Sequence, residues 1–95
     1  MVVGSLRVTL RLHGVRSLKE KRSPRRMLTD RVRSRFKVAA SEVADQDVLN
    51  LLTLAFATVG PDASVVEAVL RSIADHIEDA GVGELIDESV FLDRH

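Results

Sequence analysis

Two stretches with helical spacing, each flanked by stretches with strand spacing, constrain the fold of this chain more than any other feature. Apolar and polar side chains alternate over residues 5–12, which is typical of a strand with one buried face. Apolar side chains recur at helical spacing over residues 24–36 and again over residues 63–79. Strand-like patterns occupy three further segments, residues 37–43, 49–59 and 85–92. The order of elements is therefore strand, helix, strand, strand, helix, strand.

Two strand–helix–strand units in this order predict an α+β fold, the ferredoxin-like βαββαβ sandwich, because right-handed crossovers bring their strands into one sheet. In that fold four antiparallel strands form the sheet, and both helices cover one of its faces. We expect the strands to lie in the spatial order fourth, first, third, second. A pair of unrelated hairpin units is a less compact alternative. The side chains expected to lie buried together between helices and sheet are Leu28, Val32, Phe36, Val66, Leu70 and Ile73.

The start of the first helix can be placed in two ways. Ser17 and Glu20 have the spacing of a capping box, which favours a helix that begins there. Pro24 lacks an amide hydrogen and suits the first position of a helix. We therefore expect residues 17–22 to form a turn and the helix to begin at Pro24, with Ser23 as its N-cap. The second helix has a clearer start, because Asp62 is a natural N-cap for residues 63–79.

Length and composition predict one domain, residues 1–95, that folds without disulfides or metals. A chain of this length buries roughly 60–65% of its unfolded surface, which is enough for a single core. There is no cysteine, so neither a disulfide nor a thiolate zinc site can form. The first residues lack the pattern of a signal peptide, and no apolar run approaches the roughly 20 residues that cross a bilayer. We expect a cytoplasmic protein that does not enter membranes and carries no cofactor.

The charge of the chain is neutral in total but strongly divided. Ten of the fourteen Lys and Arg residues lie in residues 16–37, where the only acids are Glu20 and Asp30, so this segment carries a net charge of +8. Residues 38–95 carry a net charge of −10. Such a division predicts a basic surface that faces an anionic partner.

Three strings of residues together resemble the bacterial YlxP-like family, also known as domain of unknown function 503. They run from Ser17 to Arg22, from Arg33 to Phe36 and from Glu42 to Asp47. The chain departs from the family at Pro24-Arg25, where an aliphatic pair is usual, and at Leu49, where an aromatic residue is common. The resemblance implies a small ferredoxin-like protein, and many members are encoded among translation and ribosome-maturation genes. It implies no established activity.

The basic segment favours RNA as the anionic partner, because clustered cations release counterions when they meet phosphate. We expect ribosomal RNA or a ribosomal particle to bind there. The chain has three phenylalanines and no tyrosine or tryptophan, so an aromatic stacking surface is missing and binding would be by phosphate and shape. The alternative is a solvated or internally paired helix face. The candidate contacts are Lys19, Lys21, Arg22, Arg26, Arg33 and Lys37.

The uncovered face of the sheet supports a second hypothesis, a homodimeric scaffold or a protein-interaction module that uses this face. If the apolar residues of 5–12 face the helices, then Arg7 and Arg11 lie on the open face, where Asp87 is the nearest candidate acid. The central strand, residues 49–59, presents one of two sets to that face: either Leu52, Leu54 and Phe56, or Thr53, Ala55 and Ala57. A small apolar surface of this kind could close a homodimer. The candidate interface residues are Arg7, Arg11, Ala55 and Ala57.

Catalysis has the weakest support in the sequence. Asp45 and Asp47, with Glu42 nearby, could hold a magnesium ion or act as acid and base, but aspartates are common in turns for local reasons. No nucleophile has an evident base beside it. We therefore expect a non-enzymatic binding module without a metal site, since metal-ligand spacing is also missing among His13, His76 and His95.

Overall fold

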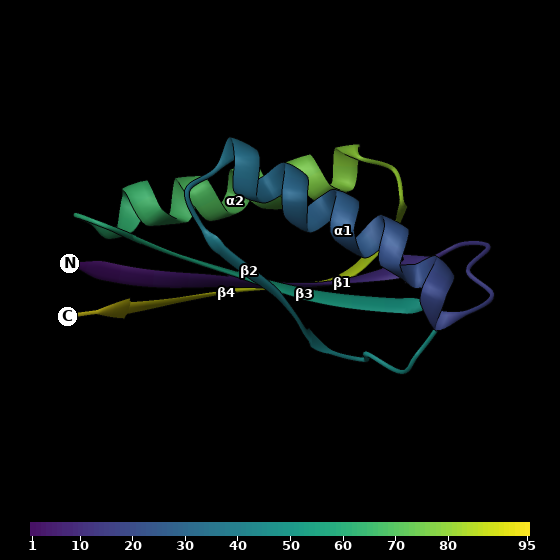
Figure 1. Ribbon diagram of the computed structural model, residues 1–95. Helices are drawn as coiled ribbons and strands as arrows, with labels where there is room; N and C mark the ends of the chain where they lie inside the picture. The colour runs from purple at the N-terminus through teal and green to yellow at the C-terminus, as the bar shows by residue number, and fades with distance from the viewer.

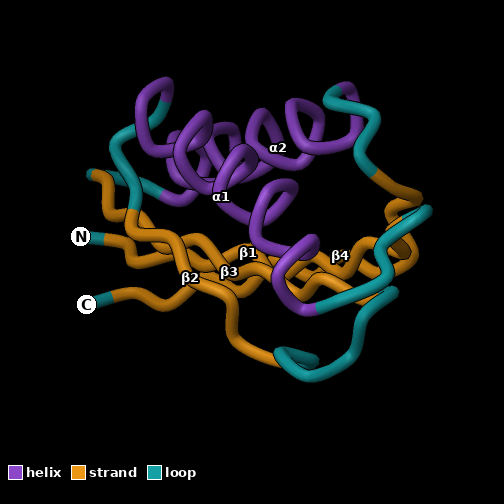
Figure 2. The backbone as a smooth tube through the Cα atoms, turned by 45° about the vertical axis from the view of Figure 1, so that its right-hand side comes forward, coloured by secondary structure: helices purple, strands orange, loops and turns teal.

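A computed structural model describes residues 1–95 and shows the six predicted elements in the predicted order (Figure 1). Their bounds are β1 Val2–Leu12, α1 Leu18–Arg35, β2 Ala39–Ala44, β3 Leu51–Gly60, α2 Ala63–Asp79 and β4 Gly83–Arg94. Both helices lie on one side of the sheet, and Figure 2 shows them as a single layer over the strands. Neither helix is long and apolar enough to cross a bilayer.

The four strands form one sheet in the order β2-β3-β1-β4, and every neighbouring pair is antiparallel. The predicted ferredoxin-like fold and strand order are therefore confirmed. The sheet has two edges of unequal length, since β2 has 6 residues and β4 has 12. The open face, which the helices do not cover, spans all four strands.

The core lies between the helices and the sheet and contains 15 buried apolar residues. The even-numbered apolar residues of β1 point into it, so Arg7 and Arg11 lie on the open face as predicted. On β3 the inward set is Leu52, Leu54 and Phe56, which leaves Thr53, Ala55 and Ala57 on the open side. The side chains of the predicted core that are fully buried are Leu28, Val32, Val66, Leu70 and Ile73.

Phe36 is the exception in the predicted core, because it is only half-buried. Helix α1 ends at Arg35, and Phe36 is its C-cap in an extended conformation. Its ring meets the ring of His76 edge-on, with centroids 6.2 Å apart. The residue thus closes the end of the core instead of lying inside it.

Helix α1 begins earlier than predicted. Ser17 is its N-cap and accepts a hydrogen bond from the Glu20 amide at 3.1 Å, while the Glu20 carboxylate accepts from the Arg16 amide at 2.5 Å. The prediction of a turn over residues 17–22 with Ser23 as N-cap was therefore wrong. Pro24 lies inside the helix, where it removes only the bond to the Glu20 carbonyl, and Glu20 is exposed to solvent.

Helix α2 begins as predicted, with Asp62 as its N-cap. The Asp62 carboxylate accepts from the Ser64 hydroxyl at 2.6 Å and from the Val65 amide at 3.0 Å. Both hydrogen bonds lower the pKa of Asp62 below its ordinary value of 3.8, and the one from Ser64 has the larger effect. Because the pKa is lower in the folded state, the ionised cap stabilises the fold above pH 3.8, and this contribution is lost as the pH falls through the folded pKa.

The Asp62→Asn variant is expected to lose less stability than the wild type as the pH falls. Asparagine keeps an oxygen acceptor for the Val65 amide but does not ionise. Between about pH 5 and pH 2 the wild type should therefore lose more thermal stability than the variant, since all other carboxyls are common to both. Melting curves followed by circular dichroism across that range test this expectation, and parallel pH curves for the two proteins would contradict it.

Candidate functional site

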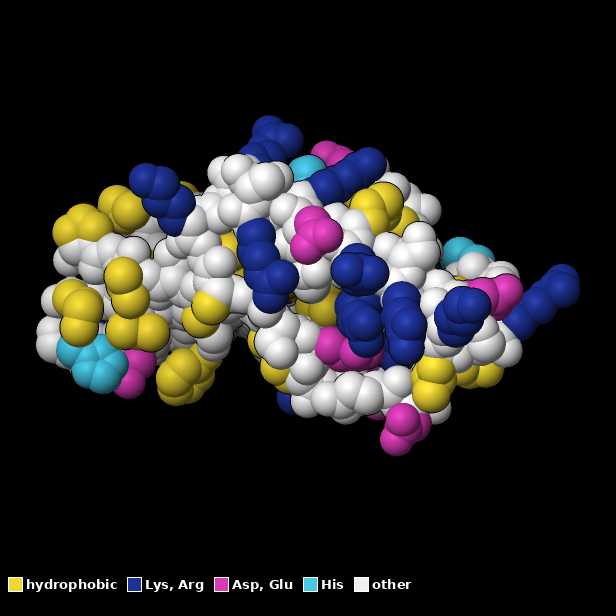
Figure 3. All heavy atoms as spheres, viewed as in Figure 1, with side chains coloured by type: hydrophobic (Ala, Val, Ile, Leu, Met, Phe, Trp, Pro, Cys, Tyr) yellow, Lys and Arg dark blue, Asp and Glu magenta, His cyan; other side chains and the backbone are white.

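The outer face of α1 carries four cations on one side of the helix, which we call the basic stripe: Lys19, Arg22, Arg26 and Arg33. Separations of three, four and seven residues bring side chains to the same side of an α-helix. All four are exposed, and Figure 3 shows Lys and Arg side chains gathered along this helix. Lys19, Arg22 and Arg26 form no ion pair with any carboxylate of the chain.

Arg33 is the one member of the basic stripe with internal contacts. Its guanidinium lies 3.9 Å from the Asp30 carboxylate and donates to the Ala40 carbonyl of β2 at 2.5 Å. Both side chains of this ion pair are exposed, so the pair contributes little to stability in water. These contacts orient the guanidinium toward the space between α1 and β2.

That space is a groove of about 430 Å³ between α1 and β2. Its lining comprises Arg25, Arg26, Thr29, Asp30 and Arg33 of the helix and Ala40, Ser41 and Glu42 of the strand. The Glu42 carboxylate is already engaged by two cations, one of them the Arg25 guanidinium at 3.2 Å. Three guanidinium groups and two carboxylates line the groove, so its lining carries a net charge of +1.

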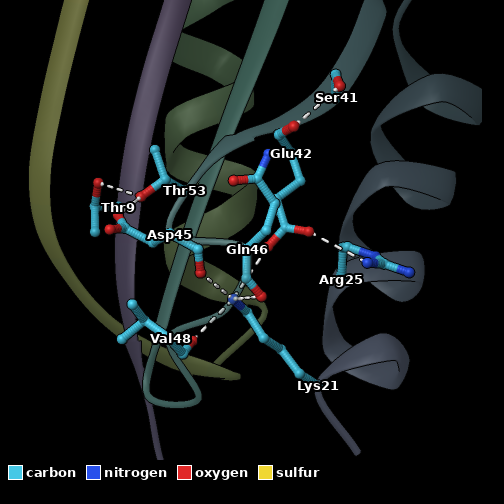
Figure 4. A network of polar contacts seen from close by, with 9 residues as sticks. All are labelled: Thr9, Lys21, Arg25, Ser41, Glu42, Asp45, Gln46, Val48 and Thr53. Atoms are coloured by element: carbon cyan, nitrogen blue, oxygen red, sulfur yellow. Dashed lines mark hydrogen bonds and ion pairs between the residues drawn. The ribbon is translucent and has the colours of Figure 1, made fainter. Parts of the chain in front are cut away.

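Lys21 lies beneath this surface and is buried, with 3% of its side chain exposed. Its ammonium group is 3.1 Å from the Glu42 carboxylate and donates to the carbonyls of Asp45 at 2.7 Å and Val48 at 2.9 Å (Figure 4). The group is thus satisfied within the chain and does not face solvent. Lys21 drops out of the candidate RNA contacts, and it instead holds the β2–β3 turn against the start of α1.

The acids of the β2–β3 turn are engaged in the same network. Asp45 has a positive φ of 57°, and its carboxylate accepts from the Thr53 hydroxyl at 2.7 Å, which in turn lies 3.0 Å from the Thr9 hydroxyl (Figure 4). Asp47 is exposed. No three His, Asp or Glu side chains lie together as a metal-ligand set. The contacts of Asp45 and Glu42 favour a structural role for both.

The remaining predicted site residues lie elsewhere. Lys37 follows the end of α1 and lines a hollow with Ala57 and Val59, away from the α1–β2 groove. Arg11 pairs with Glu84 at 3.3 Å and not with Asp87, because the β1–β4 register places Glu84 opposite Arg11. Arg7 is exposed, lies opposite Ser89 and forms no ion pair.

The structure thus brings four of the six candidate RNA contacts together and adds Arg25, which sequence reasoning missed. Arg25 directly follows Pro24. If the helix began at Pro24, Arg25 would lie in its first turn, and the sequence would not show which way its side chain points. In the longer helix it points toward Glu42, 17 residues further along the chain. A pairing at that separation leaves no local signal in the sequence.

Comparison with known proteins supplies a family. The family model described as "Protein of unknown function (DUF503)" matches residues 3–90, which is nearly the whole chain. This chain belongs to the DUF503 family. The resemblance noted in the sequence is therefore confirmed. A search of curated proteins finds no match to the DUF503 chain.

Membership of the DUF503 family establishes no activity, because the family is itself described as of unknown function. The charge, exposure and pairing of the side chains along α1 are the features of this DUF503 protein that point to a function.

Proposed function

We propose that this DUF503 protein binds the phosphate backbone of structured RNA through the basic stripe and the α1–β2 groove, without catalysing a reaction. The observation that carries the proposal is that Lys19, Arg22 and Arg26 are exposed on one side of one helix and lack ion pairs. Side chains in that state can exchange counterions for phosphate at little cost, because no internal partner is lost.

The dimensions of the basic stripe suit a polyanion better than a small anion. At 1.5 Å per residue, the helix from Lys19 to Arg33 is about 21 Å long, which is enough to follow several successive phosphates. The groove beside it adds Arg25, whose side chain is 36% exposed. Small anions would occupy only part of this surface.

Recognition of this kind does not read bases. Phosphate contacts position a protein on a nucleic acid without sequence information. The basic stripe has no aromatic side chain on which a base can stack, since Phe36 lies beyond the end of α1 and is half-buried. We therefore propose recognition by charge and shape. A ribosomal particle is the RNA partner that the gene context of the resemblance favours, and it would place the protein in the cytoplasm.

The absence of catalysis is part of the proposal and has its own support. Two carboxylates line the groove: that of Glu42 is held by Lys21 and Arg25, and that of Asp30 lies 3.9 Å from the Arg33 guanidinium. A general acid or base has to reach a proton of the substrate. Glu42 is 8% exposed and already paired, so it is poorly placed for that task.

Filter binding of structured RNA across a salt series tests the proposal. With about four phosphate contacts, the logarithm of the affinity should fall with the logarithm of the salt concentration at a slope of about −3 to −4. The Arg26→Ala/Arg33→Ala variant should bind roughly tenfold or more weakly at about 0.1 M salt, with a slope shallower by about 2. RNAs of different sequence should be affected alike.

The matched control is the Arg31→Ala/Arg35→Ala variant. It removes the same charge from the same helix, but on the flank that faces away from the basic stripe. It should retain most of the affinity, and unfolding curves should show that both variants are folded. Unaltered RNA binding by Arg26→Ala/Arg33→Ala would refute the proposal, as would equal losses in the two variants.

A further inference from the structure

The open face of the sheet carries one row of side chains that runs from large to small. Strand pairing places Phe91 of β4 beside Ser5 of β1, Ser5 beside Ala57 of β3, and Ala57 beside Ala39 of β2. Phe91 is 70% exposed, so its ring projects from the face. The other end of the row is a shallow hollow of about 210 Å³. A cavity of about 150 Å³ accepts a benzene ring, so this hollow is large enough for a phenyl group.

We propose that a second copy of this chain packs on the open face, about a two-fold axis that runs parallel to the strands between β1 and β3. This inference is independent of RNA binding. Such an axis places β4 of each copy over β2 of the other. Each row of side chains that runs across the sheet then faces the same row of the second copy. Phe91 of one copy then enters the hollow over Ala39 of the other, and the same contact is repeated across the axis.

The neighbouring row gives the same arrangement its charge complementarity. It contains Asp93 on β4, Val3 on β1 and Val59 on β3, and Lys37 lies beside Val59 at the β2 end. The two-fold axis brings Val3 over Val59 of the second copy and Asp93 over its Lys37. Lys37 has no ion pair within its own chain, and Asp93 forms an ion pair only with His95. Opposite charges therefore meet at both rims.

The size of the face fits a stable dimer. Four strands about 4.8 Å apart and on average roughly 30 Å long give about 600 Å² of flat area per copy. The β2–β3 turn covers the end of this face around Thr53, which is buried against Asp45. Stable interfaces bury about 800 Å² on each partner, and the side-chain relief of a sheet makes its accessible area larger than the flat estimate. Val59 is 63% exposed in the single chain, so burial of this end removes apolar side chains from water.

Arg7 lies where the apolar rows end, one row beyond Ser5 and beside Ala55. Its long side chain can extend past Ala55 of the second copy and keep its guanidinium in water. The basic stripe lies on the opposite side of the molecule, so the two copies would expose one stripe each on their outer surfaces.

Sedimentation equilibrium of the wild type and two matched variants tests the dimer. We expect the wild type to be dimeric at micromolar concentration. Ala57→Asp should weaken dimerisation on the order of 100-fold, because it places carboxylates next to the axis, away from water. Ala68→Asp makes the same change on the exposed face of α2 and should leave the dimer intact. A monomeric wild type at about 1 mM, or equal behaviour of the two variants, would overturn the proposal.

Charge exchange and cross-linking test the axis itself. Lys37→Asp and Asp93→Lys should each weaken the dimer by about 3- to 10-fold, and the double variant should recover the affinity. The chain has no cysteine, so Ser41→Cys and Ser89→Cys each introduce a single thiol. These positions face one another between copies, so a short bis-maleimide should link the two proteins when mixed and neither one alone. A lack of recovery in the double variant, or a link within either single protein preparation, would reject this axis.

Discussion

The Lys21→Met variant is expected to lose about 3–5 kcal/mol of unfolding free energy, which is typical when one partner of a buried ion pair is removed. Methionine preserves most of the shape of the side chain but has neither its charge nor its donors. Glu42, 8% exposed, would keep only Arg25 as a partner. The carbonyls of Asp45 and Val48 would lose the donor that now holds the β2–β3 turn. Urea unfolding followed by circular dichroism measures the difference.

Two further variants separate the ion pair from other effects. Arg22→Met makes the same kind of change one residue further along α1, at an exposed position, and should alter stability by no more than about 0.5 kcal/mol. Lys21→Met/Glu42→Leu should recover part of the loss, because apolar replacement of a whole buried pair is often neutral. If Lys21→Met were as stable as Arg22→Met, the buried network would not hold this part of the fold.

The second large effect is expected for Phe56→Ala, which should lower the unfolding free energy by about 3–5 kcal/mol through lost burial and a cavity. Phe56 is 1% exposed and belongs to the inward set of β3, under the helices. Its size makes the cavity hard to close by relaxation of the neighbouring side chains. Urea unfolding at a concentration where the chain is monomeric isolates this term from any effect of association.

Phe91→Ala is the matched control, because it deletes the same ring from the opposite face of the same sheet. Phe91 is 70% exposed, so its removal should change the stability of the monomer by no more than about 0.5 kcal/mol. Equal losses of stability for Phe56→Ala and Phe91→Ala would contradict the placement of Phe56 in the core and Phe91 on the open face.

Local spacing in the sequence was enough to predict the fold class and the face on which many side chains lie. The alternation over residues 5–12 has a period of two, so burial of its apolar set forces Arg7 and Arg11 onto the open face. The stripe of α2 has helical spacing and a capping aspartate, so its start and its buried side were both predictable. The separation of charge between residues 16–37 and 38–95 likewise follows from the order of residues in the sequence alone.

The site depended on contacts between residues far apart in the chain. Residues 18–22 are helical although Pro24 favours a later start, and Lys21 ties this first part of α1 to carbonyls 24 and 27 residues away. The same contacts bury one predicted RNA contact and orient Arg25 into the groove, while the β1–β4 register gives Arg11 a different acid from the expected one. Periodicity specifies which side of an element is apolar, but not which distant group will meet a given charge. That choice is made when helices and strands pack together, because only then do burial and strand register bring the partners within reach.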